Sequence, residues 1–161
     1  MKIRLATPDD LQFTDEVFAA ARERMRAEGN TQQWVNGYPS HEVILRDISR
    51  GEGYIIEAQG CVSGYFCLQH GLEPTYAQIR GEWPSEGPYL TIHRAAARIA
   101  GLHIFPAIIS FASRYGLTLR ADTHAQNKTM QRLLLRHGFR YCGEITLSDG
   151  SPRLAYQLVL P

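Results

Sequence analysis

The run from Leu117 to Gly143 constrains the fold most, because it joins three secondary-structure patterns with almost no spare residues between them. It opens with a short β-type run that ends in turn-favouring Asp, Thr and His residues. An amphipathic helical pattern follows, which begins near Asn127 and ends at Gly138, and a second β-type run follows that glycine. The sequence therefore predicts a strand, a helix and a strand in close succession. Because open α/β sheets bind ligands where a strand end meets a helix N-terminus, we expect the active half of the molecule here.

The other hydrophobic patterns place this unit in a mixed α/β sheet. An antiparallel beginning followed by the strand–helix–strand centre predicts a sheet with both kinds of pairing and helices on both faces. With no internal repeat, low-complexity segment or linker, the chain 1–161 is expected to form a single domain. The expected elements are a strand over 3–7, helices from Pro8 to Gly29 and from Ser40 to Gly51, a hairpin of 54–58 and 62–68, a loop over 71–88 with a short helix near 75–79, a strand over 89–96, a helix over 104–115 and a last strand over 154–160.

Charge, cysteine and apolar patterns exclude several classes of function. A formal net charge of +1 and the lack of a Lys/Arg run argue against nucleic-acid binding. No signal peptide is visible, and the longest apolar span, residues 95–112, is interrupted by Arg98, His103 and Pro106, so we expect no membrane span. Three cysteines without C-x-x-C spacing favour a reducing cytoplasm, and six histidines without metal-ligand spacing predict no metal site.

A second joint between a strand and a helix lies at residues 98–103, with the sequence RIAGLH. The backbone N–H groups at a helix start have no partner within the helix, and they point at any anion bound there, which the helix dipole also attracts. One glycine and one arginine make this joint a candidate anion site. Taken alone, the pattern also fits a plain turn with an exposed arginine.

With its surroundings, this joint resembles the pyrophosphate loop of the GNAT superfamily of acetyl-CoA-dependent N-acetyltransferases, which reads Q/R-x-x-G-x-G/A. Only the last position departs, where His103 stands in place of a glycine or alanine. Residues 127–139 (NKTMQRLLLRHGF) match the pattern N-x-x-A/M-x-x-L-Y-x-x-x-G-F, except that Leu134 occupies the tyrosine position. The triplets IHR at 92–94 and DTH at 122–124, with the QW and GYP of residues 33–39, are similar to a bacterial subgroup.

The resemblance covers nearly the whole chain, and it implies the GNAT fold and acetyl-CoA as cofactor. It implies that the amides of the 98–103 joint hold the pyrophosphate, that the end of the preceding strand pairs with the pantetheine arm, and that Asn127 meets the arm or the acetyl end. The residues so implied are Ala95, Ala96, Ala97, Arg98, Ala100, Gly101, Leu102, His103 and Asn127.

Acetyl transfer to an amine needs a base that removes a proton from the ammonium group. Strand alternation and a reference pKa near working pH make His93 the first candidate, with a core histidine as the alternative. His124 is the second candidate, and its alternative is a role in a turn. Glu82 could reach over the site from its loop, although loop glutamates are mostly solvated. Tyr141 and Cys142 are candidate proton donors, with plain sheet packing as the alternative.

Aromatic residues in irregular segments are expected to line the acceptor side. Trp34, Tyr38 and Trp83, with Glu82, are the candidate substrate-binding residues, and the alternative for the aromatics is anchoring of loops on the core. We expect direct transfer of the acetyl group to a primary amine of a small molecule or a protein. The alternative is a GNAT-fold acyl-CoA-binding module with weakened or lost catalysis, which His103 and Leu134 suggest. Such domains often dimerise, so a homodimer is a further expectation.

Overall fold

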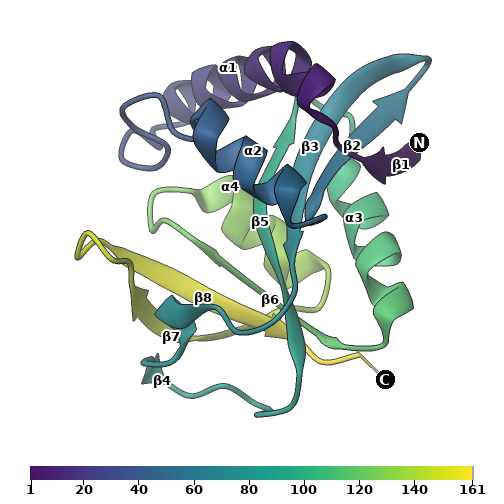
Figure 1. Cartoon of the computed structure of the whole chain (residues 1–161). Coiled ribbons are helices and arrows are strands. Elements are labelled where there is room, and N and C mark those ends of the chain that lie inside the picture. The colour runs from purple at the N-terminus through teal and green to yellow at the C-terminus, as the bar shows by residue number, and fades with distance from the viewer. Residues whose placement is uncertain (161) are drawn as a thin grey trace.

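A computed structural model describes residues 1–160, which form one eight-stranded sheet with helices on both faces (Figure 1). The strand order is β1-β2-β3-β5-β6-β8-β7-β4. The strands are β1 (Lys2–Leu5), β2 (Gly53–Ala58), β3 (Cys61–Gln69), β4 (Arg80–Gly81), β5 (Tyr89–Ala97), β6 (Thr118–Thr123), β7 (Arg140–Thr146) and β8 (Pro152–Leu158). The α-helices are α1 (Leu11–Ala27), α2 (His41–Ser49), α3 (Ile104–Ala112) and α4 (Lys128–Arg136), and the short 3₁₀ helices are η1 (Pro8–Asp10), η2 (Pro74–Tyr76) and η3 (Ser113–Tyr115).

Two apolar clusters bind the helices to the sheet. Alternating side chains of the strands point to opposite faces, so Tyr65 packs with α1 and α2 while its neighbour Phe66 packs with α3 and α4. Both rings are fully buried. This arrangement confirms the predicted mixed α/β sheet with helices on both faces. Among the helices of residues 1–160, none is long and apolar enough to cross a membrane.

The sheet divides between β5 and β6. These two strands are parallel, and they pair only where Tyr89–Thr91 lies beside residues 118–120. Beyond this point β5 continues along β3, and β6 continues along β8, both in antiparallel pairing. The two strands therefore separate toward their C-terminal ends (Figure 1).

The predicted strand, helix and strand form as β6, α4 and β7, but β6 and β7 are not neighbours. The last strand, β8, lies between them and pairs with both. At the start of α4, Asn127 caps the helix, because its Oδ1 accepts a hydrogen bond of 3.0 Å from the N–H of Met130. Gly138 follows the helix with φ of +88°, the left-handed conformation that glycine tolerates best.

The loop expected over residues 71–88 contains two elements that the sequence patterns locate poorly. The short helix lies at η2, slightly earlier than expected, and β4 was not expected at all. Strand β4 pairs with β7 at Gly81 and Gly143, where a Cβ on either residue would lie 2.1 or 2.2 Å from a backbone oxygen. Two glycines are a weak signal for a strand, although they are what permits this close approach. The helix expected over 104–115 ends at Ala112 and continues as η3.

The start of the first helical segment offers a test of a local electrostatic contribution to stability. Asp10 accepts two hydrogen bonds of 2.9 Å from the guanidinium of Arg4 and one of 2.8 Å from the N–H of Thr7, and it is 4% exposed. The bonds from Arg4 lower the pKa of Asp10 despite its burial. We expect Asp10→Asn to lower the free energy of unfolding by about 2 kcal/mol in urea titrations at pH 7, because the capping box and the ion pair are both weakened. Asp9→Asn, in the same turn but exposed, is the control. Equal losses in the two variants would contradict this account.

Candidate active site

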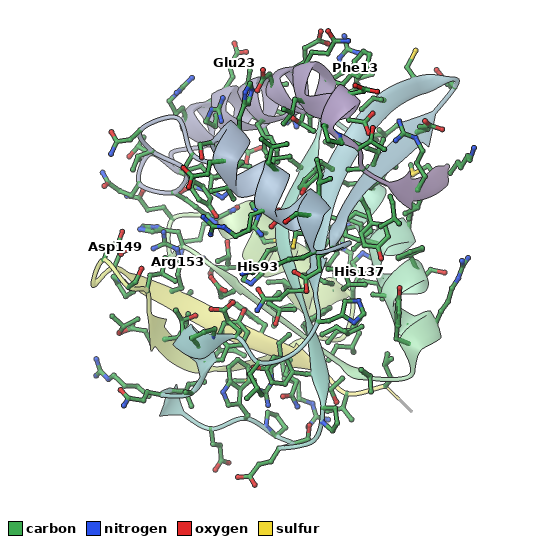
Figure 2. All side chains as sticks on the ribbon, viewed as in Figure 1. Phe13, Glu23, His93, His137, Asp149 and Arg153 are labelled. Carbon is green, nitrogen blue, oxygen red and sulfur yellow. The ribbon has the colours of Figure 1, made fainter. Side chains whose placement is uncertain are left out.

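A cleft of about 960 Å³ lies between the separated ends of β5 and β6. Its walls include residues 92–97 of β5 and residues 121–123 of β6, and it is also lined by the segment between α1 and α2 and by the β7–β8 hairpin. Residues of α2 and Phe105 of α3 both line it, so it reaches both faces of the sheet. Figure 2 shows His93 in the middle of the molecule, with Asp149 and Arg153 toward the hairpin.

The edge of β5 that faces the cleft has no strand partner beyond Thr91. On its other edge the pairing with β3 shifts register, because His93 lies opposite Cys67 while Ala96 lies opposite Tyr65. Arg94 and Ala95 therefore form a β-bulge, in which Arg94 has φ of +53°. Ala95, Ala96 and Ala97 all line the cleft with small side chains. An open strand edge of this kind can pair with an extended ligand.

The joint between β5 and α3 leaves its amides free. Within residues 1–160, the N–H groups of residues 99–103 donate no hydrogen bond. Gly101 has φ of +78°, and a Cβ built there would meet nothing within 4 Å. His103 is exposed, has φ of +49°, and makes no side-chain cap on α3. Arg98 lies beside Glu16, with 2.7 Å between Nη2 and Oε2. The local geometry is compatible with the predicted anion-binding site at residues 98–103, and the roles of the individual residues stay predictions.

His93 lies in the cleft and contacts a carboxylate. Its Nε2 is 3.2 Å from Oε2 of Glu73, and the two side chains are 19% and 14% exposed. Because a carboxylate can only accept, Nε2 carries the hydrogen, and Nδ1 of the neutral ring keeps its lone pair. Oε1 of Glu73 accepts from the hydroxyl and the N–H of Thr75, at 2.9 and 3.3 Å. Burial raises the pKa of Glu73, but the bonds from His93 and Thr75 outweigh it and bring the pKa to about 2.

A second carboxylate lies on the opposite wall. Asp122, on β6, accepts a hydrogen bond of 2.7 Å from the hydroxyl of Tyr76, and burial raises the pKa of that hydroxyl well above its usual value. Glu73 and Tyr76 belong to the same short turn around η2. This turn thus contacts both walls, β5 through His93 and β6 through Asp122. The residue types and placement suit removal of a proton from a bound ammonium group.

The lowered pKa of Glu73 predicts how stability depends on pH. A carboxylate whose pKa is lower in the folded state stabilises the fold above its unfolded pKa of about 4.3, and this contribution is lost as the pH falls toward 2. We expect the free energy of unfolding of wild-type protein to exceed that of Glu73→Gln by about 2 kcal/mol at pH 5, and by less than half of that at pH 3. Urea titrations at both pH values test this. Glu82→Gln, which changes an exposed residue in the same loop, is the control. If the difference in free energy of unfolding between wild type and Glu73→Gln is the same at pH 3 as at pH 5, Glu73 is not ionised in the folded protein.

The predicted acceptor residues divide into two groups. Trp34 and Tyr38 line the cleft, and the Trp34 ring packs edge-on against Phe18 at 5.5 Å between centroids. Glu82 and Trp83 lie outside the cleft wall formed by the described residues. The indole N–H of Trp83 donates to the carbonyl of Tyr76 at 3.1 Å within the same loop, and the Trp83 ring packs against the guanidinium of Arg120 on β6, 4.0 Å from its centroid, so Trp83 holds the long loop on the sheet.

The other candidates for proton transfer also lie outside this wall, as far as residues 1–160 form it. His124 closes a turn, because its Nδ1 accepts from the N–H of Gln126 at 3.0 Å; burial and, less strongly, the charge of Arg153 lower its pKa. Tyr141 is 56% exposed on β7. The Cys142 thiol lies 3.3 Å from the carbonyl of Arg140, and burial raises its pKa.

Asn127 lies at the cleft but its side chain already has two partners. Besides capping α4, it donates from Nδ2 to Oε1 of Gln33 at 3.1 Å. The same oxygen accepts from Asn30 at 3.2 Å and lies 3.4 Å from the hydroxyl of Thr123. Gln33, to which the sequence patterns assigned no role in the site, therefore joins the segment before α2 to β6 and α4. Its one sequence signal was the QW pair of the family resemblance.

The described residues offer no metal centre and no thiol in the cleft. No group of three or more His, Cys, Asp or Glu residues within 1–160 could hold a metal ion. None of the three cysteines lines the cleft as residues 1–160 form it. Cys67 is buried, and burial raises the pKa of its thiol to about 12.

Comparison with solved structures places this architecture among known proteins. An acetyltransferase of the GNAT family from Streptococcus agalactiae is 33% identical, with a TM-score of 0.85 over 99% of this chain and 95% of that one. A ribosomal-protein-alanine N-acetyltransferase from Brucella melitensis is 21% identical, with a TM-score of 0.62 over 99% and 100%. A GNAT-like decarboxylase, GphF, in complex with isobutyryl-CoA is 16% identical, with a TM-score of 0.67 over 98% of each chain.

The last two structures show a shared fold only, whereas the first is similar in sequence over nearly the whole length of both chains. No protein-family model and no curated protein matched the sequence. The extent of the likeness to the Streptococcus agalactiae enzyme, together with the divided mixed sheet, shows that this chain belongs to the GNAT family of acetyltransferases.

Proposed function

We propose that this protein is an acetyl-CoA-dependent N-acetyltransferase that transfers the acetyl group directly to a primary amine of a small molecule or a protein. One observation carries the proposal: the unpaired edge of β5 leads from the free amides of residues 99–103 to the His93–Glu73 pair. A binding strip for a long thioester and a candidate base thus lie on one strand.

The residues at this strip fit coenzyme A. Amides that donate no hydrogen bond and the helix dipole of α3 favour a diphosphate at the joint. The open space beside Gly101 lets a ligand approach the main chain, and Ala95 to Ala97 line the strand edge with small side chains. At the end of this edge the guanidinium of Arg24 donates to the carbonyls of Ala97 and Arg98, so a ligand that pairs there replaces this contact. Acetyl-CoA supplies the thioester whose acetyl group is transferred. The GNAT-like decarboxylase was solved with isobutyryl-CoA, which supports an acyl-CoA ligand for the fold in general.

His93 is the proposed base. Its Nδ1 lone pair receives the proton of the acceptor ammonium, directly or through one water, and the ionised Glu73 holds the ring and stabilises the imidazolium that forms. Asp122 on the facing wall attracts the ammonium group before it is deprotonated. With no cysteine in the described cleft wall, transfer without an acyl-cysteine intermediate is the simpler route.

One observation favours the second candidate, a binding module with weakened catalysis. Leu134, which stands where related families place a tyrosine, is fully buried in the core and offers no proton donor. The leaving thiolate would then depart unprotonated or take its proton from water.

Calorimetric titration with acetyl-CoA, followed by a screen of primary amines that reads free thiol release and product mass, separates these candidates. The enzyme hypothesis predicts binding in the micromolar range and thiol release that depends on the amine. Binding without release for any amine would favour the binding module. No binding at millimolar acetyl-CoA would remove both.

A further inference from the structure

Arg94 lies at the bulge of β5 in a backbone conformation that requires support. Its φ of +53° is in the left-handed region, which costs a residue other than glycine about 1 kcal/mol. The residue before it is His93 and the residue after it is Ala95, so its conformation sets the direction of both the candidate base and the open strand edge.

The guanidinium of Arg94 uses all three nitrogens to join separate elements. Nε and Nη2 donate to the two carboxylate oxygens of Asp47 on α2, at 2.9 and 2.6 Å. Nη1 donates to the hydroxyl of Tyr38 at 3.1 Å, in the segment before α2. The side chains of Arg94 and Asp47 are only 13% and 6% exposed, and Tyr65 on β3 donates to the same carboxylate at 2.8 Å. A two-pronged, buried ion pair of this kind fixes orientation more rigidly than a single contact.

We propose that Arg94 is a positioning residue. It holds the bulge of β5 at a fixed distance from Tyr38 in the cleft wall, and it thereby positions both His93 and the strand edge. This inference rests on the proposed function, because it assigns Arg94 a role in that reaction. Asp47 is the anchor, since it ties the guanidinium to α2. Tyr38 is placed in the cleft wall by the same group.

The Arg4–Asp10 pair provides a matched control. It is also a two-pronged Arg–Asp ion pair, with both bonds at 2.9 Å, and neither residue lines the cleft as residues 1–160 form it. Asp10→Asn therefore reports how the loss of such a pair, here together with the capping-box bond from Thr7, affects stability at a position away from the cleft. Asp47→Asn keeps the shape of the side chain and weakens the grip on Arg94, and Arg94→Lys keeps the charge but removes the fork.

We expect Asp47→Asn and Arg94→Lys to lower kcat about 10- to 100-fold, measured at a temperature at which circular dichroism shows each variant folded. The Kd for coenzyme A should rise by a smaller factor than kcat falls, because the strand edge contacts only the proposed pantetheine arm, whereas the proposed diphosphate site at residues 99–103 lies beyond the bulge. Asp10→Asn should retain kcat and KM. The imidazole NMR signals of His93, assigned with His93→Gln, should move in Asp47→Asn and stay in place in Asp10→Asn.

Two results would overturn the inference. One is a kcat in Asp47→Asn and Arg94→Lys within threefold of wild type; the other is a His93 signal that does not move in either variant. If wild-type protein releases no thiol with any amine, the proposed function fails instead. The NMR comparison then still shows whether Arg94 orients His93.

Discussion

His93→Gln is expected to lower kcat about 10²- to 10³-fold and to leave the Kd for acetyl-CoA within about threefold of wild type. Glutamine keeps a donor toward Glu73 but has no group that accepts a proton at neutral pH. The rate should be measured from pH 6 to pH 9 at saturating acetyl-CoA. If His93 is the base, the acidic limb of kcat/KM for the amine disappears in the variant.

Two further histidine variants sharpen this test. His70→Gln changes an exposed residue outside the described cleft wall and is the control for general effects. His124→Gln tests the second candidate base, whose Nδ1 lies 3.0 Å from a backbone nitrogen and is engaged there. A loss of rate in His124→Gln with an unaltered pH profile in His93→Gln would exchange the roles of the two residues.

Gly101→Asp is expected to weaken binding of acetyl-CoA about 100-fold relative to Gly101→Asn, because like charges brought together cost several kcal/mol. Both side chains accept the left-handed conformation better than most, and both enter the open space beside Gly101, so the pair isolates the charge. Calorimetric titrations at about 0.05 and 0.5 M salt give the comparison. The ratio of the Kd of Gly101→Asp to the Kd of Gly101→Asn should be smaller at the higher salt concentration, where the Debye length is shorter.

Equal affinities of Gly101→Asp and Gly101→Asn would place the diphosphate elsewhere. In that case the exposed His103, at the start of α3, is the next residue to examine. A strong loss in both variants would instead show that the space beside Gly101 is filled by the ligand.

Local sequence patterns predicted the helices and strands well, but they predicted less well which strands lie side by side in the sheet. The strand, helix and strand around Asn127 follow from hydrophobic period, a cap and a terminal glycine, all of which act within a few residues. The hairpin of β7 and β8 follows from the turn residues at 148–151, whereas the pairing of β8 with β6, which places β8 between β6 and β7, joins strands far apart in the sequence and has no local signal. Strand β4 is two residues long, and its only trace is a glycine whose partner is 62 positions away, at Gly143.

The site divides in the same way. Alternation along β5 singled out His93, and the structure lines the cleft with it. Glu73 was not predicted, because a glutamate in a loop 20 residues earlier has no local signal that it will contact this histidine. Gln33 and Arg94 are similar: their roles come from side chains that meet across elements. The family resemblance supplied the cofactor residues, which neither period nor spacing could have provided.

The parallel contact between β5 and β6 is short, and the two strands diverge beyond it. Three residue pairs join the strands there, and β5 extends six residues beyond, which is about 20 Å. A rotation of β5 by about 3° at this contact would shift its C-terminal end by about 1 Å, and such a displacement can change a rate about 100-fold. We therefore expect substitutions at Thr91 and Leu119, which touch no reacting atom of the proposed site, to change the rate through the angle between the two strands. Residues where β5 and β6 still pair are therefore targets for changing the rate, as well as residues at the separated ends of the two strands.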